Sequence, residues 1–329
     1  MLFGVGDFSG QRPPGSPVTH RQLYMELLEQ AASIERSGLD SMWVSEHHFA
    51  EDGYMPAVLP IVAALLARTT RITVATDRLA ASLHHPIRLA EDAIALDLLS
   101  GGRFVLGLSL CYRAEELAGF GLTPDAEETR LEAVARTLSA GFRAGTMRVD
   151  GRDVRITPGP STPKGPRLMI AADRAGGAKR AGRLAAMLMV DPTEPWKVVD
   201  AAVGDFDRSR GDSDGDLVLF TYGALSHEGA RAAWAEVADG FRYMRHNYDR
   251  WMDREQTREL PPAHYRLLLG TPDEVVGQAG EYRERYGDRV HLVLRCNYPG
   301  MDAAAVERQI ALWGEAAALL RTSARSFRA

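Results

Sequence analysis

The 329-residue sequence lacks several features that would each define a class of protein. With only two cysteines, Cys111 and Cys296, it does not suit a disulfide-stapled secreted fold, and a reducing cytoplasm fits better. No apolar run approaches the ~20 residues that span a membrane, and no export signal opens the chain. The 39 basic residues are outnumbered by 44 acidic ones, and the interspersed signs argue against nucleic-acid binding. We therefore expect a cytoplasmic protein that binds neither membranes nor nucleic acid.

Short apolar runs are what the sequence has instead, and each has the length of a buried strand. Eight can be recognised: Leu2–Gly6, Ser41–Val44, Ile72–Ala75, Phe104–Leu108, Leu168–Ala171, Ala186–Val190, Leu217–Phe220 and His291–Leu294. Near-continuous apolar strands are typical of a parallel sheet that is covered on both faces.

Helical patterns separate most of these runs. Thr19 and Gln22 form a capping box ahead of an amphipathic segment, and Pro86 begins another helix that Gly101 ends. Strand–helix alternation repeated eight times over this length predicts an α/β fold, a (β/α)8 TIM barrel, as one domain over residues 1–329. An open, doubly wound sheet is the alternative, because alternation alone does not establish closure.

Two insertions interrupt the alternation. Residues 147–156 predict a hairpin that turns at Asp150–Gly151, before the fifth strand. Residues 227–287, between the seventh and eighth strands, are too long for one helix, and residues 241–262 mix aromatic and basic side chains. We expect a helical excursion whose aromatic residues pack on the barrel rim; a lid over the site is the alternative.

A cluster of polar residues follows the second predicted strand. The stretch GLDSMWVSEHHF, residues 38–49, places Ser45, Glu46, His47 and His48 directly after an apolar run. Ionisable groups at the end of a buried strand are costly unless they are satisfied or used. Because histidine titrates near neutral pH, this is the first candidate active site, with a pair of hydrogen-bonded core histidines as the alternative.

The active site of such a barrel lies at the carboxyl ends of its strands. The residues that follow the other predicted strands include Phe8, Thr76, Asp77, Arg78, Ser109, Cys111, Tyr112, Arg113, Asp173, Arg174, Asp191, Tyr222, Arg295 and Asn297. This set is rich in titratable and hydrogen-bonding side chains, as expected of a catalytic mouth.

Metal binding is not predicted, but an anion site is a candidate. Adjacent strand residues point to opposite faces, so the pairs His47–His48 and His84–His85 each offer one inward ligand, whereas zinc needs three or four. In residues 173–182, DRAGGAKRAG, Gly176 and Gly177 would let backbone N–H groups approach a phosphate. A simple tight connection explains the same glycines equally well.

Three stretches carry a family resemblance: GLDSMWVSEHHF, TTRITVATDRLAASLHHPIRLAEDAIALDLLSGGRFVLGL and CYRAEELAGFG. Together with LLLGTPDEVVGQAGEYRERYGDRVHLVLRCNYPGMD near the end, they resemble the bacterial luciferase-like flavin-dependent monooxygenase family. The resemblance implies a (β/α)8 barrel, usually a homodimer. It also implies that reduced FMN, delivered by a separate flavin reductase, reacts with O2 to oxygenate a small molecule. A sister branch uses a deazaflavin coenzyme for hydride transfer.

The resemblance implies roles for single residues as well. His47 matches the family histidine that faces the flavin and acts as a base, which a neutral imidazole can do near pH 7. His48 would support His47 or turn outward, and His84 would orient the loop that enters the third helix.

Three places depart from the family pattern. Where the family commonly has G-x-x-R-G-Y after the fourth strand, Leu110 replaces the arginine that holds the flavin phosphate. That loss is worth on the order of 1.5–3 kcal/mol. After the fifth strand, Arg174 could restore the positive charge beside Asp173. After the third strand, Asp77 and Arg78 take the place of small residues against which the flavin ring lies.

The leading hypothesis is an FMNH2- and O2-dependent oxidoreductase that monooxygenates a small organic substrate, for example a biosynthetic intermediate. In this interpretation His47, His48 and Asp77 are catalytic; Thr76, Asp77, Leu110, Tyr112, Arg174, Gly176 and Gly177 bind the cofactor; and Phe8, Arg78, His84, Tyr222 and Arg295 contact the substrate. Three alternatives stay open. They are deazaflavin-dependent hydride transfer, a flavin-free barrel that catalyses a cyclisation, elimination or isomerisation, and a non-catalytic partner subunit of an active homologue.

Overall fold

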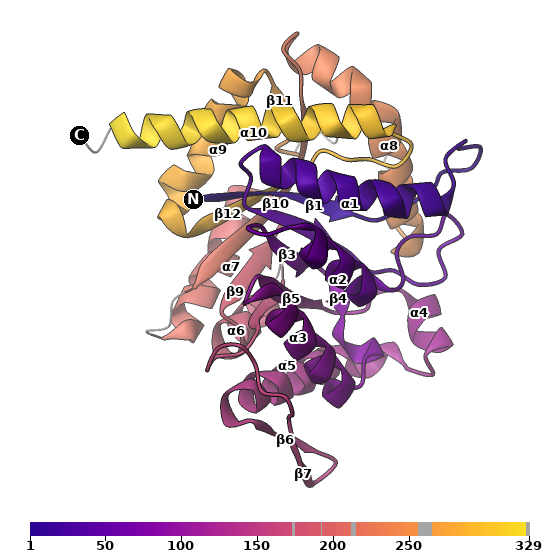
Figure 1. Ribbon diagram of the computed structural model, residues 1–329, viewed down its shortest axis with the longest axis vertical. Coiled ribbons are helices and arrows are strands. Elements are labelled where there is room, and N and C mark those ends of the chain that lie inside the picture. Colours follow the sequence, from indigo (N-terminus) through magenta and orange to yellow (C-terminus); the bar gives the residue numbers. More distant parts are fainter. Residues whose placement is uncertain (173–174, 192, 212–214, 256–264, 327–329) are drawn as a thin grey trace.

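The computed structural model (Figure 1) describes residues 1–172, 175–191, 193–211, 215–255 and 265–326. Its centre is a closed barrel of eight parallel strands. They are β1 (Leu2–Phe8), β2 (Ser41–Val44), β3 (Thr73–Thr76), β5 (Phe104–Ser109), β8 (Arg167–Ala171), β9 (Met187–Val190), β10 (Asp216–Leu225) and β12 (Val290–Arg295). Each contains one of the predicted apolar runs or nearly all of it, which confirms the predicted barrel.

Closure of the barrel comes from the pairing of β9 with β10. Asp216 lies opposite Met187 and Leu219 opposite Val190, and β10 then pairs with β12, which pairs with β1. The sheet therefore has no gap between its first and last strands, and the open doubly wound alternative is wrong.

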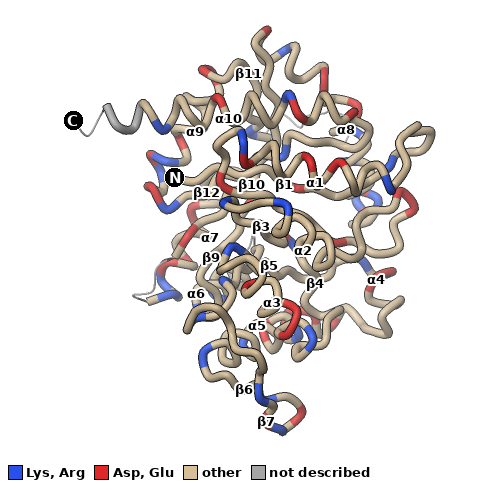
Figure 2. The backbone as a smooth tube through the Cα atoms, viewed as in Figure 1, with Lys and Arg blue, Asp and Glu red and all other residues tan. Residues whose placement is uncertain are grey.

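Helices cover the outside of the barrel (Figure 1). They are α1 (His20–Arg36), α2 (Val58–Arg68), α3 (Pro86–Ser100), α5 (Glu127–Ala144), α6 (Ala175–Leu184), α7 (Trp196–Arg210), α9 (Pro272–Tyr286) and α10 (Ala303–Ser326). The predicted capping box of Thr19 and Gln22 is present, and Gly101 ends α3 in the left-handed conformation with φ 63°. Figure 2 shows acidic and basic residues interspersed along these helices.

The short hairpin is formed by β6 (Thr146–Val149) and β7 (Arg152–Arg155), before the fifth barrel strand β8. Asp150 and Gly151 turn it, with φ angles of 48° and 75°. Both angles are positive, as a two-residue hairpin turn requires, so the predicted hairpin is confirmed.

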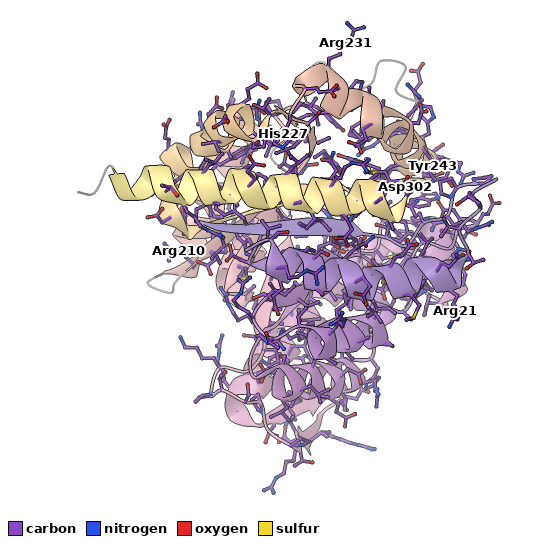
Figure 3. The ribbon with its side chains drawn as sticks, turned by 45° about the horizontal axis from the view of Figure 1, so that its top comes forward. Arg21, Arg210, His227, Arg231, Tyr243 and Asp302 are labelled. Carbon is purple, nitrogen blue, oxygen red and sulfur yellow. The ribbon has the colours of Figure 1, made fainter. Side chains whose placement is uncertain are left out.

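The long insertion between β10 and β12 contains α8 (Ala230–Trp251), β11 (Leu268–Gly270) and α9. The C-terminal half of α8 returns to the carboxyl ends of the barrel strands. There Tyr243 donates a hydrogen bond to Asp52 Oδ2 at 2.9 Å, and Figure 3 shows Tyr243 at the end of the molecule where α1 starts near Arg21. The aromatic residues of α8 thus pack on the rim, as predicted; residues 256–264 of this insertion lie outside the described residues.

The smaller elements at the same end complete the rim. They are β4 (Leu79–Ala80), α4 (Ala114–Gly119) and 3-10 turns at Ala81–Leu83 and Pro124–Ala126; a third 3-10 turn, Gly287–Arg289, precedes β12. Within the described residues, no helix is long and apolar enough to cross a membrane.

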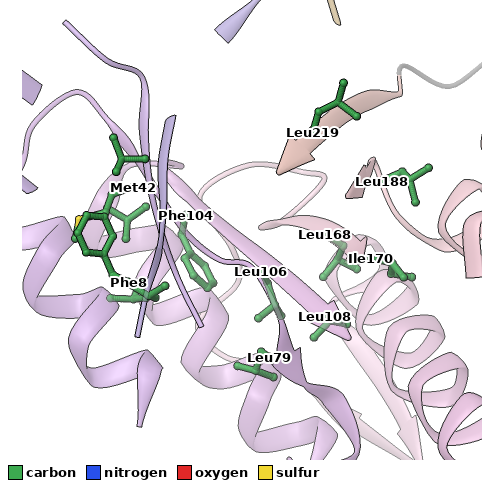
Figure 4. Packing of buried hydrophobic residues seen from close by; sticks show 14 of the residues in the cluster. Phe8, Met42, Leu79, Phe104, Leu106, Leu108, Leu168, Ile170, Leu188 and Leu219 are labelled. Carbon is green, nitrogen blue, oxygen red and sulfur yellow. The ribbon is translucent and has the colours of Figure 1, made fainter. Parts of the chain in front are cut away.

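Two buried apolar layers hold the barrel together. One lies between strands and helices and includes Phe8, Met42 and Phe104 (Figure 4). The other fills the barrel interior and includes Trp43, Met169 and Phe220, which come from three different strands. Because the interior is filled with side chains, the open space of the barrel lies at its carboxyl end, where the candidate site residues gather.

Candidate active site

A cavity of about 420 Å³ opens at the carboxyl ends of the barrel strands. That volume lies in the range of small-molecule sites, which run from about 300 to 1,000 Å³. Of the residues predicted for the site, His47, Arg78, Leu110, Tyr112, Gly177 and Tyr222 line this cavity. The structure therefore brings residues from five of the predicted strand ends to one space.

The imidazole of His47 is held from both sides. Its Nδ1 lies 2.8 Å from Glu116 Oε1, and its Nε2 lies 3.0 Å from the hydroxyl of Tyr112. Glu116 Oε1 also accepts hydrogen bonds from the backbone N–H of His48 at 2.8 Å and from Arg113 Nη1 at 3.0 Å. Burial raises the pKa of Glu116, but the hydrogen bonds and the charges of His47 and Arg113 outweigh burial, so that its pKa is lowered.

These contacts assign the tautomer of His47. An ionised carboxylate can only accept hydrogen bonds, so the proton of a neutral His47 sits on Nδ1 and points at Glu116. Nε2 is then an acceptor, and the hydroxyl of Tyr112 donates to it. Glu116 lies on the short helix α4, directly after β5, and its carboxylate is what orients the ring.

Aromatic rings surround His47. The ring centroids of Tyr54, Trp251 and Tyr112 lie 4.7, 5.0 and 5.3 Å from that of His47. Trp251 comes from the end of α8, and the guanidinium carbon of Arg113 lies 4.5 Å from its ring centre. The rings of α8 thus exclude water from one side of the imidazole.

His48 and His84 bind Glu46 instead of facing the cavity. Glu46 accepts hydrogen bonds from His84 Nε2 at 3.0 Å and from the backbone N–H of Ala80 at 2.8 Å, and His48 Nε2 lies 3.4 Å away. Burial raises the pKa of Glu46, but the bonds from His48, His84 and Ala80 outweigh it and lower the pKa to about 2. Glu46 therefore ties β2 to the loop after β3. The alternative of a pair of hydrogen-bonded core histidines does not describe His47 and His48, because His47 faces the cavity and His48 Nε2 lies 3.4 Å from Glu46.

A buried cluster of charges lies beneath the cavity floor. Asp7 Oδ2 accepts a hydrogen bond from Arg295 Nη1 at 2.8 Å, and the hydroxyls of Tyr54 and Tyr248 each lie 3.3 Å from the same oxygen. Asp7 lines the cavity; Asp77 is fully buried beside it. Burial, and then the charge of Asp7, raise the pKa of Asp77 well above its usual value and so favour its neutral form.

Other predicted residues have positions outside the cavity wall. Phe8 lines a separate cavity of about 60 Å³ next to α1, and Thr76 exchanges hydrogen bonds with the backbone of Gly107 at 2.9 and 3.0 Å. Arg295 is buried under the floor, and Asp173 and Arg174 lie outside the described residues. Asp77 does not occupy the cavity itself, whereas Arg78 does line it.

Several cavity residues escaped the sequence analysis: Asp7, Tyr54, Glu116, Arg180, Arg245, Tyr248 and Tyr265. Asp7 directly precedes the predicted Phe8. A register shift between Val5 and Phe8 turns Asp7 inward while Phe8 packs outward, and only the pairing of β1 with β2 reveals it. Glu116 has a weak signal, because it follows Arg113 at helical spacing after a strand end.

In the part of the chain that the structure describes, no group of three or more His, Cys, Asp or Glu side chains is arranged to hold a metal ion. The two cysteines are buried; Cys111 Sγ lies 3.3 Å from Glu116 Oε2, and burial first and then Glu116 raise the pKa of its thiol. Cys111 is therefore a protonated neighbour of the His47–Glu116 pair.

A family model described as luciferase-like monooxygenase matches residues 1–289. The chain belongs to the luciferase-like monooxygenase family. It spans about half the length of the curated relatives it matches. For example, it is 26% identical over 162 residues to the alkanal monooxygenase beta chain of Photorhabdus luminescens, covering 48% of this chain and 50% of that one.

Solved structures resemble this luciferase-like protein over almost its whole length. Monooxygenase RslO1 from Streptomyces bottropensis has a TM-score of 0.77 at 22% identity, covering 96% of this chain and 98% of that one. The oxygenating constituent of 3,6-diketocamphane monooxygenase from Pseudomonas putida, in complex with FMN, has a TM-score of 0.76 at 16% identity, covering 95% of this chain and 96% of that one. An F420-dependent secondary alcohol dehydrogenase has a TM-score of 0.73 at 15% identity, covering 97% of this chain and 98% of that one. Identities of this size show the shared fold alone.

The cavity of this luciferase-like protein fits a flavin or deazaflavin ring system. Phe220 and Tyr222 give it flat apolar walls, and Gly177 brings the first turn of α6 to its edge without a side chain. Arg180 of the same helix also lines the cavity, is 6% exposed and forms ion pairs with Glu128 at 2.9 Å and with Glu132 at 3.5 Å. After β5, apolar Leu110 forms the wall, and an anionic cofactor tail would share the guanidinium of Arg180 with these carboxylates.

Proposed function

We propose that this protein is an FMNH2-dependent monooxygenase that oxygenates a small organic molecule with O2. The observation that carries the proposal is the His47 imidazole, oriented by Glu116 and presented on the wall of a 420 Å³ cavity that is lined by arginine and tyrosine side chains. Membership of the luciferase-like monooxygenase family supports it, as does the likeness to a monooxygenase component in complex with FMN.

The protein's own residues would bind, shield and move a proton. The reduced flavin, when bound, supplies the chemistry with O2. Phe220 and Tyr222 would contact its ring, and Arg180 with the first turn of α6 would hold its phosphate. Tyr248 and Trp251 of α8 would keep water away from His47, which exchanges a proton at Nε2. Asp7, at the cavity wall, and Asp77, buried beside it, would stay a structural pair.

A homodimer that receives reduced flavin from a separate reductase is part of the same proposal and rests on the family resemblance. Deazaflavin-dependent hydride transfer is the second candidate, favoured by the likeness to an F420-dependent alcohol dehydrogenase. A flavin-free, redox-neutral reaction is the third, favoured by apolar Leu110 where the family carries an arginine. The identity of the bound cofactor separates all three.

Anaerobic calorimetric titration of the purified protein with FMNH2, FMN and a deazaflavin coenzyme tests the proposal. We expect micromolar binding of FMNH2 and weaker binding of the other two. Arg180→Gln should weaken FMNH2 binding about tenfold or more, because a charge-assisted phosphate contact is lost. Arg183→Gln is the matched control, since Arg183 is on the same helix but outside the cavity lining. No FMNH2 binding up to millimolar concentration would refute the proposal.

A further inference from the structure

The hydroxyl of Tyr112 lies next to His47 at the cavity wall. It lies 3.0 Å from His47 Nε2, the ring nitrogen that Glu116 leaves available, and Tyr112 itself lines the cavity. A base usually presents its acceptor nitrogen to the reacting molecule. Here that nitrogen is already engaged by a side chain that also lines the cavity, so the phenolic oxygen of Tyr112 offers a route by which a proton from a bound molecule can reach Nε2.

The carboxylate of Glu116 determines the directions of the hydrogen bonds along the chain Glu116–His47–Tyr112. Glu116 Oε1 accepts from His47 Nδ1, from Arg113 Nη1 and from the backbone N–H of His48. When His47 is neutral, the Nδ1 proton is therefore committed to Glu116, Nε2 accepts, and Tyr112 donates its only hydroxyl proton to Nε2. Among the described residues, His47 is the hydrogen-bond partner of the Tyr112 hydroxyl, so the lone pairs of the Tyr112 oxygen can accept a hydrogen bond from the cavity side.

The cavity walls indicate what such an acceptor would meet. Aromatic side chains of Phe220, Tyr222, Tyr248 and Tyr265 line it, which favours a flat, ring-bearing molecule. Burial first, and then the charges of Tyr248 and Glu116, raise the pKa of Tyr112 above its usual value of 10, so Tyr112 takes part as a neutral hydroxyl. Phenols and enols are the organic hydroxyls that are acidic enough to supply it with a proton near neutral pH.

We infer that Tyr112 is a catalytic residue that relays a proton from a phenol or enol substrate to His47. The substrate O–H bond breaks and its proton binds the Tyr112 oxygen, while the Tyr112 proton moves to His47 Nε2. The electron pair stays on the substrate oxygen, and the Glu116 carboxylate stabilises the imidazolium. No oxidant or reductant takes part. The ionised ring is richer in electrons, which suits it to accept oxygen in the proposed reaction, and in that respect the inference rests on the proposed function.

Para-nitrophenol tests the relay, because its phenol and phenolate forms absorb at different wavelengths. The probe is titrated with the wild-type protein without flavin, at a pH below the probe's own pKa. We expect it to bind as the phenolate, with an apparent pKa lowered by about one unit, a tenfold change in the ratio of the two forms. Tyr112→Phe and His47→Gln should each abolish this shift, and Glu116→Gln should reduce it. Tyr286→Phe, which removes a hydroxyl on α9 outside the cavity lining, is the matched control.

The outcomes are separable. If Tyr112→Phe keeps the full phenolate shift, His47 acts directly and the relay is refuted. If Tyr112→Phe loses the shift but His47→Gln keeps it, Tyr112 acts alone and the relay is equally refuted. If the wild-type protein does not bind the probe, or binds it without a shift, the substrate class is wrong. An unchanged melting temperature shows that Tyr112→Phe is folded. Because the assay contains no flavin, its result is independent of the FMNH2 titration, which tests the proposed function on its own.

Discussion

Replacing Asp7 and Asp77 by asparagine, one at a time, should give opposite results although the chemical change is the same. Asp7 Oδ2 lies 2.8 Å from Nη1 of the fully buried Arg295, with which it forms an ion pair. At an effective dielectric constant of 20, that contact corresponds to about 6 kcal/mol of Coulomb energy. Removing one partner of a buried pair costs about 3–5 kcal/mol. We expect Asp7→Asn to lower the free energy of unfolding by about 3 kcal/mol, the lower end of this range, because Asp77 can then ionise and pair with Arg295.

Because burial raises the pKa of Asp77, its neutral form is favoured near pH 4, and there Asp77→Asn should cost less than about 1 kcal/mol of unfolding free energy. The difference from wild type should also depend on pH. Because the folded pKa of Asp77 is raised above 3.8, the native state holds a proton that the unfolded state releases, and wild-type stability falls as pH rises. Asp77→Asn has no proton to lose at this position. Its free energy of unfolding should therefore rise relative to that of wild type by up to about 1.4 kcal/mol per pH unit above 3.8.

Urea unfolding of the three proteins between pH 4 and pH 7 measures both effects, provided that the denaturant slopes agree. The explanation would be refuted if Asp77→Asn were as destabilising as Asp7→Asn at pH 7. It would also be refuted if the stability difference between Asp77→Asn and wild type did not change with pH, because Asp77 would then be ionised in the native state.

Two further predictions concern the cavity wall and the Glu46 tie. Leu110→Arg should tighten FMNH2 binding about tenfold in calorimetry by adding a charge-assisted phosphate contact, with Leu110→Met as the control; equal affinities would place the phosphate elsewhere. Glu46 has a folded pKa of about 2 against 4.5, so its stabilising contribution is present above pH 4.5 and lost as pH falls toward 2. Wild type should lose about 3 kcal/mol relative to Glu46→Gln over that interval in acid unfolding, and parallel curves would contradict this.

The barrel was predictable because buried parallel strands carry their own signal. Each apolar run, such as Ser41–Val44, is bounded by turn residues, and the intervening helices begin and end at recognisable caps such as Thr19 and Gly101. Closure was inferred from the number of strands and needed the β9–β10 pairing to be established. The position of His47 at a strand end was equally visible, since the polar break follows the strand directly.

The partners of His47 were not predictable in the same way. Glu116 is 69 residues away from it, and Tyr248 is 241 residues away from Asp7. Contacts across such separations in sequence depend on helix orientation and on the register shift in β1. Neither feature produces a periodic pattern in the amino-acid sequence. The role of Asp77 was also assigned from its place after β3 alone. Asp77 is buried beside Asp7, which favours its neutral form, and it is not among the residues that line the cavity.

The attachment of α8 has a consequence for how this protein can diverge. Side-chain hydrogen bonds join its C-terminal half to the rim: Tyr243 and Asn247 donate to Asp52 Oδ2 at 2.9 and 3.1 Å, and Tyr248 donates to Asp7 Oδ2 at 3.3 Å. The strand ladder of the barrel, by contrast, is made of backbone groups. Substitutions in this half of α8 therefore reshape the roof over His47 while the ladder keeps its hydrogen bonds. New substrate preferences can accordingly be acquired in one helix, at little cost to the scaffold that carries it.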